Sequence, residues 1–283
     1  MGQMRRIAIG SPVQQKPAIL RQFLNGLYQQ ELDGIEAEYV FVDDNHDEAS
    51  SALLRQFADA VPGVVLVPIP PAEPYQCDDT THRWKESLVW RVAEIKDAII
   101  EHALEKGHEG LFLVDSDIVL QPPTVRHLAE LGCDIVSEVF WTKWQPDAPE
   151  YPQVWSLDQY DLIPRKRGEQ LSKEEGVRRL NLVLSQLRTP GLYEVGGLGA
   201  CTMISRRALE MGARFKEIPN ISLWGEDRHF CVRAAALGIV LNADTEFPPL
   251  HIYRDGDLER VPAFAESCGL SLDAFDKPAL VAP

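Results

Sequence analysis

The chain has 283 residues, which is enough for one large α/β domain or two small ones. A hydrophobic fraction of 45% and a charged fraction of 25% are typical of globular proteins and exclude general disorder. The 43 acidic side chains outnumber the 28 basic ones, for a formal net charge of −15, and no Lys/Arg run offsets this excess. A negative field of that size excludes nucleic acid and anionic lipid surfaces as expected partners.

The sequence predicts no membrane span, because no apolar run approaches the roughly 18 residues that a span needs. The apolar stretch after Arg5 and Arg6 is too short for a signal-peptide core and is better interpreted as a first strand. We therefore expect a cytoplasmic protein. Its five cysteines are widely spaced, without a CxxC pair or zinc-site spacing, and predict reduced thiols.

Strand and helix patterns alternate through the first half of the chain. Short apolar runs predict strands at residues 6–10, 37–42, 64–68 and 110–114. Apolar residues at helical spacing predict helices at residues 17–30, 49–60 and 84–106. This alternation favours an α/β fold with a mostly parallel sheet and helices on both faces. Ligands of such sheets collect at the carboxyl ends of the strands.

The pattern changes after residues 133–139. Residues 140–164 are rich in Trp, Pro, Tyr and Asp, which predicts a long functional loop rather than a solvated linker. A helix at 172–187, a glycine-rich turn at 196–200, a strand at 201–204 and a short helix at 228–237 follow. The tail beyond residue 260 is expected to be a peripheral helix and coil.

The strongest motif is Asp115-Ser116-Asp117, which follows the uncharged apolar strand predicted at 110–114. Two carboxylates one residue apart at the end of a buried strand suit a hard divalent cation, with water and diphosphate oxygens completing its shell. The alternative is that one aspartate only caps the turn before Pro122. The position of the motif in an α/β pattern favours the metal site.

A second acidic motif is Trp224-Gly225-Glu226-Asp227. The glycine would let a substrate approach the backbone, the indole offers a face for a sugar, and the acids could bind and deprotonate an acceptor hydroxyl. The alternative is a helix N-terminus with acids in its first turn, which the helix dipole also favours.

Other candidates have structural alternatives of their own. His251 is a neutral ligand suited to a two-carboxylate site, or a packed histidine. Asp43 and Asp44 follow the second strand, where they could accept hydrogen bonds from a base or ribose, or form an Asx turn. Arg91 and Lys96, on the long helix, face either outward or toward a phosphate.

In this order the motifs resemble those of GT-A glycosyltransferases, most closely the family 2 group, over residues 6–254. By that resemblance Ser11, Pro12, Val13 and Gln14 lie in a turn that lines the nucleoside pocket, and Asp43 or Asp44 binds the base. The turn containing Gly197, Leu198 and Gly199 would lie near the donor sugar and the acceptor.

The resemblance also implies the roles of the acidic residues. Asp115 and Asp117, completed by His251, would hold Mn²⁺ or Mg²⁺ against the donor diphosphate, to which Ser116, Arg91 and Lys96 are also assigned. Glu226 would orient the acceptor and Asp227 would take its proton, as in inverting members. Trp141, in the aromatic segment 141–155, and Trp224 are expected to contact sugar or acceptor, although aromatic residues in loops also serve packing.

The resemblance therefore predicts a single GT-A domain, in which residues 1–139 bind the nucleotide sugar and residues 140–283 bind the acceptor and carry catalysis. Its function would be metal-dependent transfer of one sugar, with inversion, from a UDP- or GDP-sugar to an unidentified acceptor. Two alternatives remain open. One is a haloacid-dehalogenase-type phosphohydrolase with Asp115 as nucleophile, and the other is a non-catalytic sugar-binding module.

Overall fold

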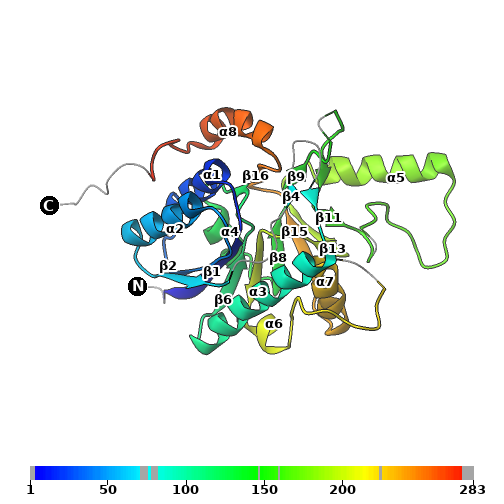
Figure 1. Ribbon diagram of the computed structural model, residues 1–283. Coiled ribbons are helices and arrows are strands. Elements are labelled where there is room, and N and C mark those ends of the chain that lie inside the picture. Colours follow the sequence, from blue (N-terminus) through cyan, green and yellow to red (C-terminus); the bar gives the residue numbers. More distant parts are fainter. Residues whose placement is uncertain are drawn as a thin grey trace.

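A computed structural model describes residues 4–70, 76–77, 82–145, 147–158, 160–222 and 225–275. Its central element is an eight-stranded sheet with the order β12-β15-β8-β14-β6-β1-β2-β3 (Figure 1). Six strands run parallel, whereas β14 and β12 are antiparallel to their neighbours. The bounds of these strands are β1 Arg5–Val13, β2 Ile35–Asp43, β3 Val64–Pro68, β6 Gly110–Leu113, β8 Ile135–Glu138, β12 Leu192–Val195, β14 Thr202–Ser205 and β15 Leu241–Asp244.

Both faces of the sheet are buried, because successive side chains of each strand point to opposite faces. On β1, Ile7 and Ile9 belong to one hydrophobic core and Ala8 to the other. On β6, Phe112 joins the first of these cores, and Leu111 joins the second. The middle of β1 and the whole of β6 are therefore apolar, as the sequence predicted.

Helices cover both faces (Figure 1). One core contains residues of α1, α2 and α4, and the other contains residues of α3, α6 and α7. Helix α5 projects from the body of the molecule and has no buried residue. The bounds are α1 Pro17–Tyr28, α2 Glu48–Ala60, α3 Glu86–Glu105, α4 Thr124–Glu130, α5 Lys173–Gln186, α6 Arg206–Glu210, α7 Glu226–Ala236 and α8 Val261–Cys268, with a 3₁₀ helix at Asp255–Arg260.

Short strands pair outside the main sheet. They are β4 Gln76–Cys77 with β5 His82–Arg83, β7 Ile118–Val119 with β16 Leu250–His251, β9 Trp141–Thr142 with β10 Tyr151–Pro152, and β11 Val154–Trp155 with β13 Gly197–Leu198. Two predictions are corrected by these pairs. The segment 140–164 contains paired strands rather than loop alone, and Gly197 and Leu198 lie in a strand rather than a turn.

Two further boundaries differ from the prediction. Strand β1 continues through Ser11, Pro12 and Val13, where a turn was expected, because its pairing with β2 extends from Arg5 to Val13. Helix α7 begins at Glu226, so both acids of the second motif lie in its first turn. Strands from both sides of the predicted division at residue 139 join one sheet, so that division stays a prediction about function.

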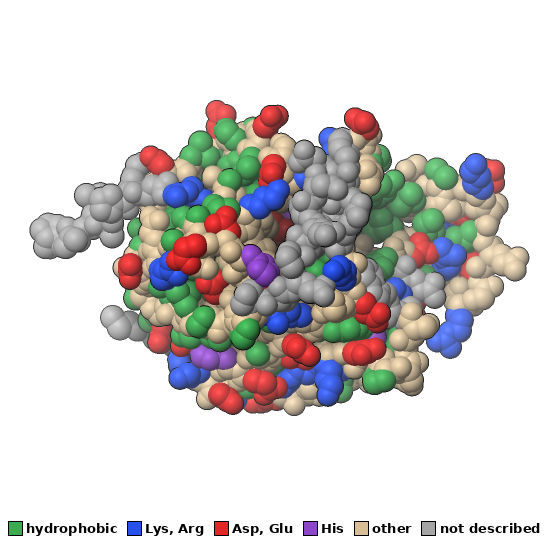
Figure 2. Space-filling model, in the orientation of Figure 1, with side chains coloured by type: hydrophobic (Ala, Val, Ile, Leu, Met, Phe, Trp, Pro, Cys, Tyr) green, Lys and Arg blue, Asp and Glu red, His purple; other side chains and the backbone are tan. Residues whose placement is uncertain are grey.

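The surface agrees with the charge pattern of the sequence. On the face shown in Figure 2, Lys and Arg side chains are interspersed with Asp and Glu, and the coloured side chains form no continuous basic patch. Within the described ranges, no helix combines the length and apolar character needed to cross a bilayer.

Candidate active site

A cavity of about 970 Å³ lies where the parallel strands end. Its lining comes from the ends of β1, β2 and β6, from α3, from the segment after β9 and from the start of α7. That volume is in the range of small-molecule sites. The predicted site residues that line it are Pro12, Val13, Gln14, Asp44, Arg91, Asp115, Ser116, Asp117, Gly199, Gly225, Glu226, Asp227 and His251.

The Asp-Ser-Asp motif lies beyond the carboxyl end of β6, and strand pairing brings His251 beside it. β16 runs antiparallel to β7, which places His251 opposite Ile118, and the Ile252 amide donates to the Asp117 carbonyl at 2.9 Å. His251 Nε2 is 3.5 Å from Asp117 Oδ2. A 2.8 Å hydrogen bond joins its other nitrogen, Nδ1, to Thr142 Oγ1 and so orients the ring.

The second oxygen of Asp117 supports the predicted metal site. Asp117 Oδ1 is buried and has no hydrogen-bond partner among the described residues. A buried carboxylate oxygen without a partner is costly unless a cation or a donor meets it. With Asp115 and the imidazole of His251 facing the same cavity, the residues present fit a divalent ion such as Mn²⁺ or Mg²⁺.

Lys96 connects the two acidic motifs. Its Nζ lies 3.1 Å from Glu226 Oε1, 3.2 Å from Asp227 Oδ1 and 3.7 Å from Asp115 Oδ1. The side chain is only 2% exposed. The outward orientation considered for this residue is therefore wrong. Lys96 lies on the apolar side of α3, and its charge is retained there because three carboxylates surround it.

The pKa values in this cluster are strongly shifted. Burial lowers the pKa of Lys96, but Asp115, Asp227 and Glu226 outweigh burial and hold that pKa well above its ordinary value. Burial raises the pKa of Asp115. Burial also raises the pKa of Asp227, to about 7. The ammonium of Lys96 opposes this rise, and the carboxylate of Glu226 adds to it. A carboxylate with a pKa near neutrality is suited to general-base catalysis.

Gly225 ends the cavity wall next to α7. Its φ of 108° is one that side-chain-bearing residues rarely adopt, and a Cβ there would lie 2.3 Å from the Tyr160 hydroxyl. Tyr160 packs edge-to-face against Trp155, with ring centroids 4.6 Å apart, and both rings line the cavity. Trp224, predicted to stack on a sugar, lies outside the described residues.

The two aspartates at the carboxyl end of β2 have different contacts. Asp43 Oδ1 accepts hydrogen bonds from the Asn45 amide, the Asn45 side chain and Ser51, so this residue forms the Asx turn that was the alternative prediction. Asp44 lines the cavity, and both of its oxygens are bound by Arg91, through Nε at 2.9 Å and Nη2 at 2.7 Å. Arg91 therefore also lines the cavity, with its guanidinium paired to Asp44, although its side chain keeps 27% of its surface exposed.

Several predicted contact residues lie outside the cavity lining. Ser11 is completely buried within β1. The guanidinium carbon of Arg188 lies over the Trp141 ring, 4.0 Å from the ring centroid. Gly197 contacts the Trp155 indole so closely that a Cβ would lie 1.9 Å from it, and Leu198 is buried in the same strand pair. These residues therefore do not line the cavity.

Sequence reasoning missed other lining residues. Tyr160 and Tyr253 line the cavity, and the Tyr253 ring packs edge-to-face on Trp144 with centroids 5.3 Å apart. Trp144, Tyr151 and Trp155, which also line it, were not missed, because they belong to the aromatic segment 141–155 whose rings were expected to contact the acceptor. The aromatic content of that segment was the available signal, but nothing local indicated which rings would face inward.

No protein-family model matches the chain. No curated protein matches it either. Among solved structures, it is similar to the mannosyltransferase PcManGT from Pyrobaculum calidifontis, in complex with GDP-Man and Mn²⁺, with a TM-score of 0.52 and 14% identity over 98% of this chain and 66% of that one. It is also similar to TarS from S. aureus, with a TM-score of 0.51 and 13% identity over 96% of this chain and 41% of that one.

The chain thus spans just under two thirds of the first neighbour and less than half of the second. At these identities the similarity to the two solved structures is evidence for the fold alone. The two structures and the sheet topology confirm the predicted fold, a GT-A-type α/β fold with a mostly parallel central sheet and helices on both faces.

Proposed function

We propose that this chain is a metal-dependent glycosyltransferase that moves one sugar, with inversion, from a UDP- or GDP-sugar to an acceptor. The observation that carries the proposal is the Asp117 carboxylate. One of its oxygens is buried without a partner, and the other lies beside His251, in a cavity that also contains Asp115 and the acids of α7. The Mn²⁺ and GDP-Man held by the mannosyltransferase neighbour add support for the metal and the donor class.

Asp115, Asp117 and His251 would hold Mn²⁺ or Mg²⁺, which would neutralise charge on the leaving diphosphate. Asp227 would accept the proton of the acceptor hydroxyl as its oxygen bonds to the anomeric carbon and the bond from that carbon to the diphosphate oxygen breaks. Glu226, one residue earlier on the same helical turn, would hold the acceptor. Pro12, Val13, Gln14 and the Asp44–Arg91 pair would surround the nucleoside.

The GT-A-type fold favours this proposal over the phosphohydrolase. A haloacid-dehalogenase-type nucleophile normally follows the first strand of the chain, whereas Asp115 follows β6, the fourth strand of the main sheet in chain order. A sugar-binding module without catalysis would not need a buried lysine that holds three carboxylates beside the cavity, one of them with a pKa raised to about 7.

The test is the variant Asp227→Asn, assayed by release of UDP or GDP from a panel of nucleotide sugars with Mn²⁺. We expect kcat to fall about 10²–10⁴-fold, because the general base is lost, while donor affinity measured by calorimetry is retained. In the unsubstituted protein, kcat/KM should decline as pH falls below about 7, since Asp227 must be deprotonated to act and its pKa is about 7.

The matched control is Asp97→Asn on α3. Burial also raises the pKa of Asp97, but this carboxylate accepts hydrogen bonds from the backbone amides of Phe215 and Lys216 and does not line the cavity. The Asp97→Asn variant should keep near-normal turnover and the same pH profile as the unsubstituted protein. Near-normal turnover of Asp227→Asn would instead show that the base has been misassigned.

A further inference from the structure

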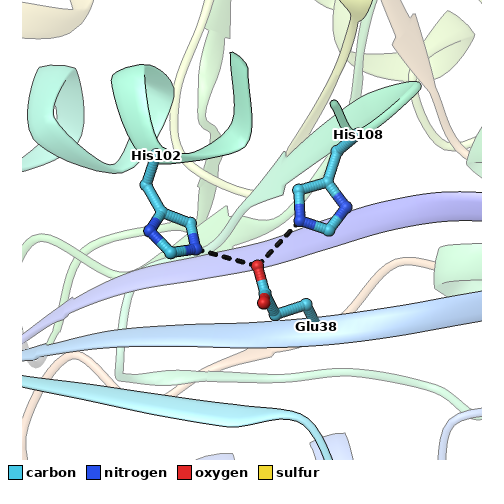
Figure 3. A group of neighbouring side chains, drawn as sticks. All are labelled: Glu38, His102 and His108. Carbon is cyan, nitrogen blue, oxygen red and sulfur yellow. Dashed lines mark hydrogen bonds and ion pairs between the residues drawn. The ribbon is translucent and has the colours of Figure 1, made fainter. Parts of the chain in front are cut away.

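A second group of metal-ligand side chains lies away from the cavity. Glu38 is on β2, His102 is in the last turn of α3, and His108 is in the connection that leads into β6. Figure 3 shows the two imidazoles converging on the carboxylate from different segments. None of these residues lines the cavity, and the proposed transfer reaction does not use them.

The geometry of this cluster is that of ligands meeting at one point. His102 Nε2 and His108 Nε2 lie 2.8 Å and 2.7 Å from the same oxygen, Glu38 Oε2. The three atoms lie within 4.8 Å of one another. Tetrahedral Zn²⁺ with bonds of about 2.0 Å separates its ligand atoms by about 3.3 Å, so each contact would widen by only about half an ångström.

One ligand of the cluster is buried, and the other two are partly exposed to solvent. His108 is 3% exposed, and its Nδ1 has no hydrogen-bond partner among the described residues, so the contact of Nε2 with Glu38 orients the ring. The side chains of Glu38 and His102 are 24% and 21% exposed. An ion can therefore enter from solvent, and a water molecule can complete a four-ligand shell.

The ligand chemistry differs from that of the cavity. Two imidazoles and one carboxylate suit Zn²⁺, and His₂Glu is a known zinc ligand set. The Asp115–Asp117 site is rich in oxygen and suits Mn²⁺ or Mg²⁺. We propose that Glu38, His102 and His108 form a second metal site, selective for Zn²⁺, that fastens β2 to the α3–β6 connection.

The consequence of this site is structural. Arg91 ties α3 to Asp44 at the cavity end of β2, and the cluster ties the other end of α3 to Glu38 on the same strand. From Arg91 to His102 the helix rises about 16 Å. Zn²⁺ would therefore add a second fixed point between α3 and β2, besides the Arg91–Asp44 pair, and this helix also positions Lys96 beside the acidic motifs.

The experiment is Zn²⁺ titration calorimetry on the metal-stripped chain carrying Asp117→Asn, which weakens the cavity site. This protein should bind one Zn²⁺ per chain and melt at a higher temperature when Zn²⁺ is present. Adding His102→Gln should weaken Zn²⁺ binding by about tenfold or more and remove the rise in melting temperature. The variant should fold, because His102 is partly exposed.

The matched control is His127→Gln in the same background. His127 Nε2 also pairs with a carboxylate, Asp244 Oδ1 at 3.0 Å, but belongs to no such cluster among the described residues, so Zn²⁺ binding should not change. His102→Gln alone should keep its response to Mn²⁺ and nucleotide, which separates this site from the cavity. The proposal is overturned if Asp117→Asn binds no Zn²⁺, or if adding His102→Gln leaves Zn²⁺ affinity unchanged.

Discussion

At the scale of single residues, Lys96 determines the electrostatics of the cavity. Its ammonium group lies within 4 Å of carboxylates from both acidic motifs, which are more than 100 residues apart in the chain. Removing one partner from a buried ionic cluster leaves uncompensated charge, which is far more costly than losing an exposed ion pair.

We therefore expect Lys96→Met to lower the free energy of unfolding by about 3–5 kcal/mol, because three carboxylates lose their common counter-charge. The control is Lys16→Met, which removes an exposed pair with Asp255 and should cost about 1 kcal/mol or less. Urea unfolding of both variants provides the measurement. Equal losses would show that Lys96 does not balance the carboxylates.

Each acidic residue of the site could be predicted from its own motif, whereas the contacts of the Lys96 side chain could not. Asp115 and Asp117 followed a recognisable strand, and Glu226 and Asp227 formed a compact motif. Lys96 stands four residues after Val92 and three before Ile99, on the apolar side of its helix. That spacing was a usable signal for an inward side chain, but it could not name the carboxylates that lie 19 and 130 residues further along the chain.

At the scale of elements, the short strands β7, β10, β11 and β16, outside the main sheet, contribute residues to the cavity lining. The pair β11–β13 places Trp155 against Gly197 and orders the aromatic segment that was predicted as a loop. Two-residue strands give no periodic pattern, and the residues that pair in β11–β13 are about 40 positions apart. Local sequence could therefore indicate the importance of this segment but not its structure.

This packing predicts the effect of Gly197→Ala. The new methyl group would lie 1.9 Å from the Trp155 indole, and we expect a loss of about 1–3 kcal/mol in the free energy of unfolding. Gly256→Ala is the control, since a Cβ there meets no atom within 4 Å and should change stability by about 0.5 kcal/mol or less. If both variants unfold at the same urea concentration, the close contact with Trp155 is not present in solution.

At the scale of the whole molecule, the alternation of strands and helices predicted the parallel part of the sheet well. Strand β3 has the predicted bounds, and β6 ends one residue before the predicted limit. The insertion of antiparallel β14 between β6 and β8 was not predicted, because strand order depends on pairing between distant segments. That insertion brings strands of the second half of the chain beside β6, the strand that precedes Asp115.

The central claim is that a divalent ion joins the Asp115–Asp117 motif to a nucleotide diphosphate. The most direct measurement is titration calorimetry of UDP and GDP, with and without Mn²⁺, on the unsubstituted protein and on Asp117→Asn. We expect Mn²⁺ to strengthen binding of at least one of the two nucleotides by about tenfold or more, and Asp117→Asn to lose this gain. Binding of both nucleotides that is equally weak with and without Mn²⁺ in the unsubstituted protein would contradict the claim.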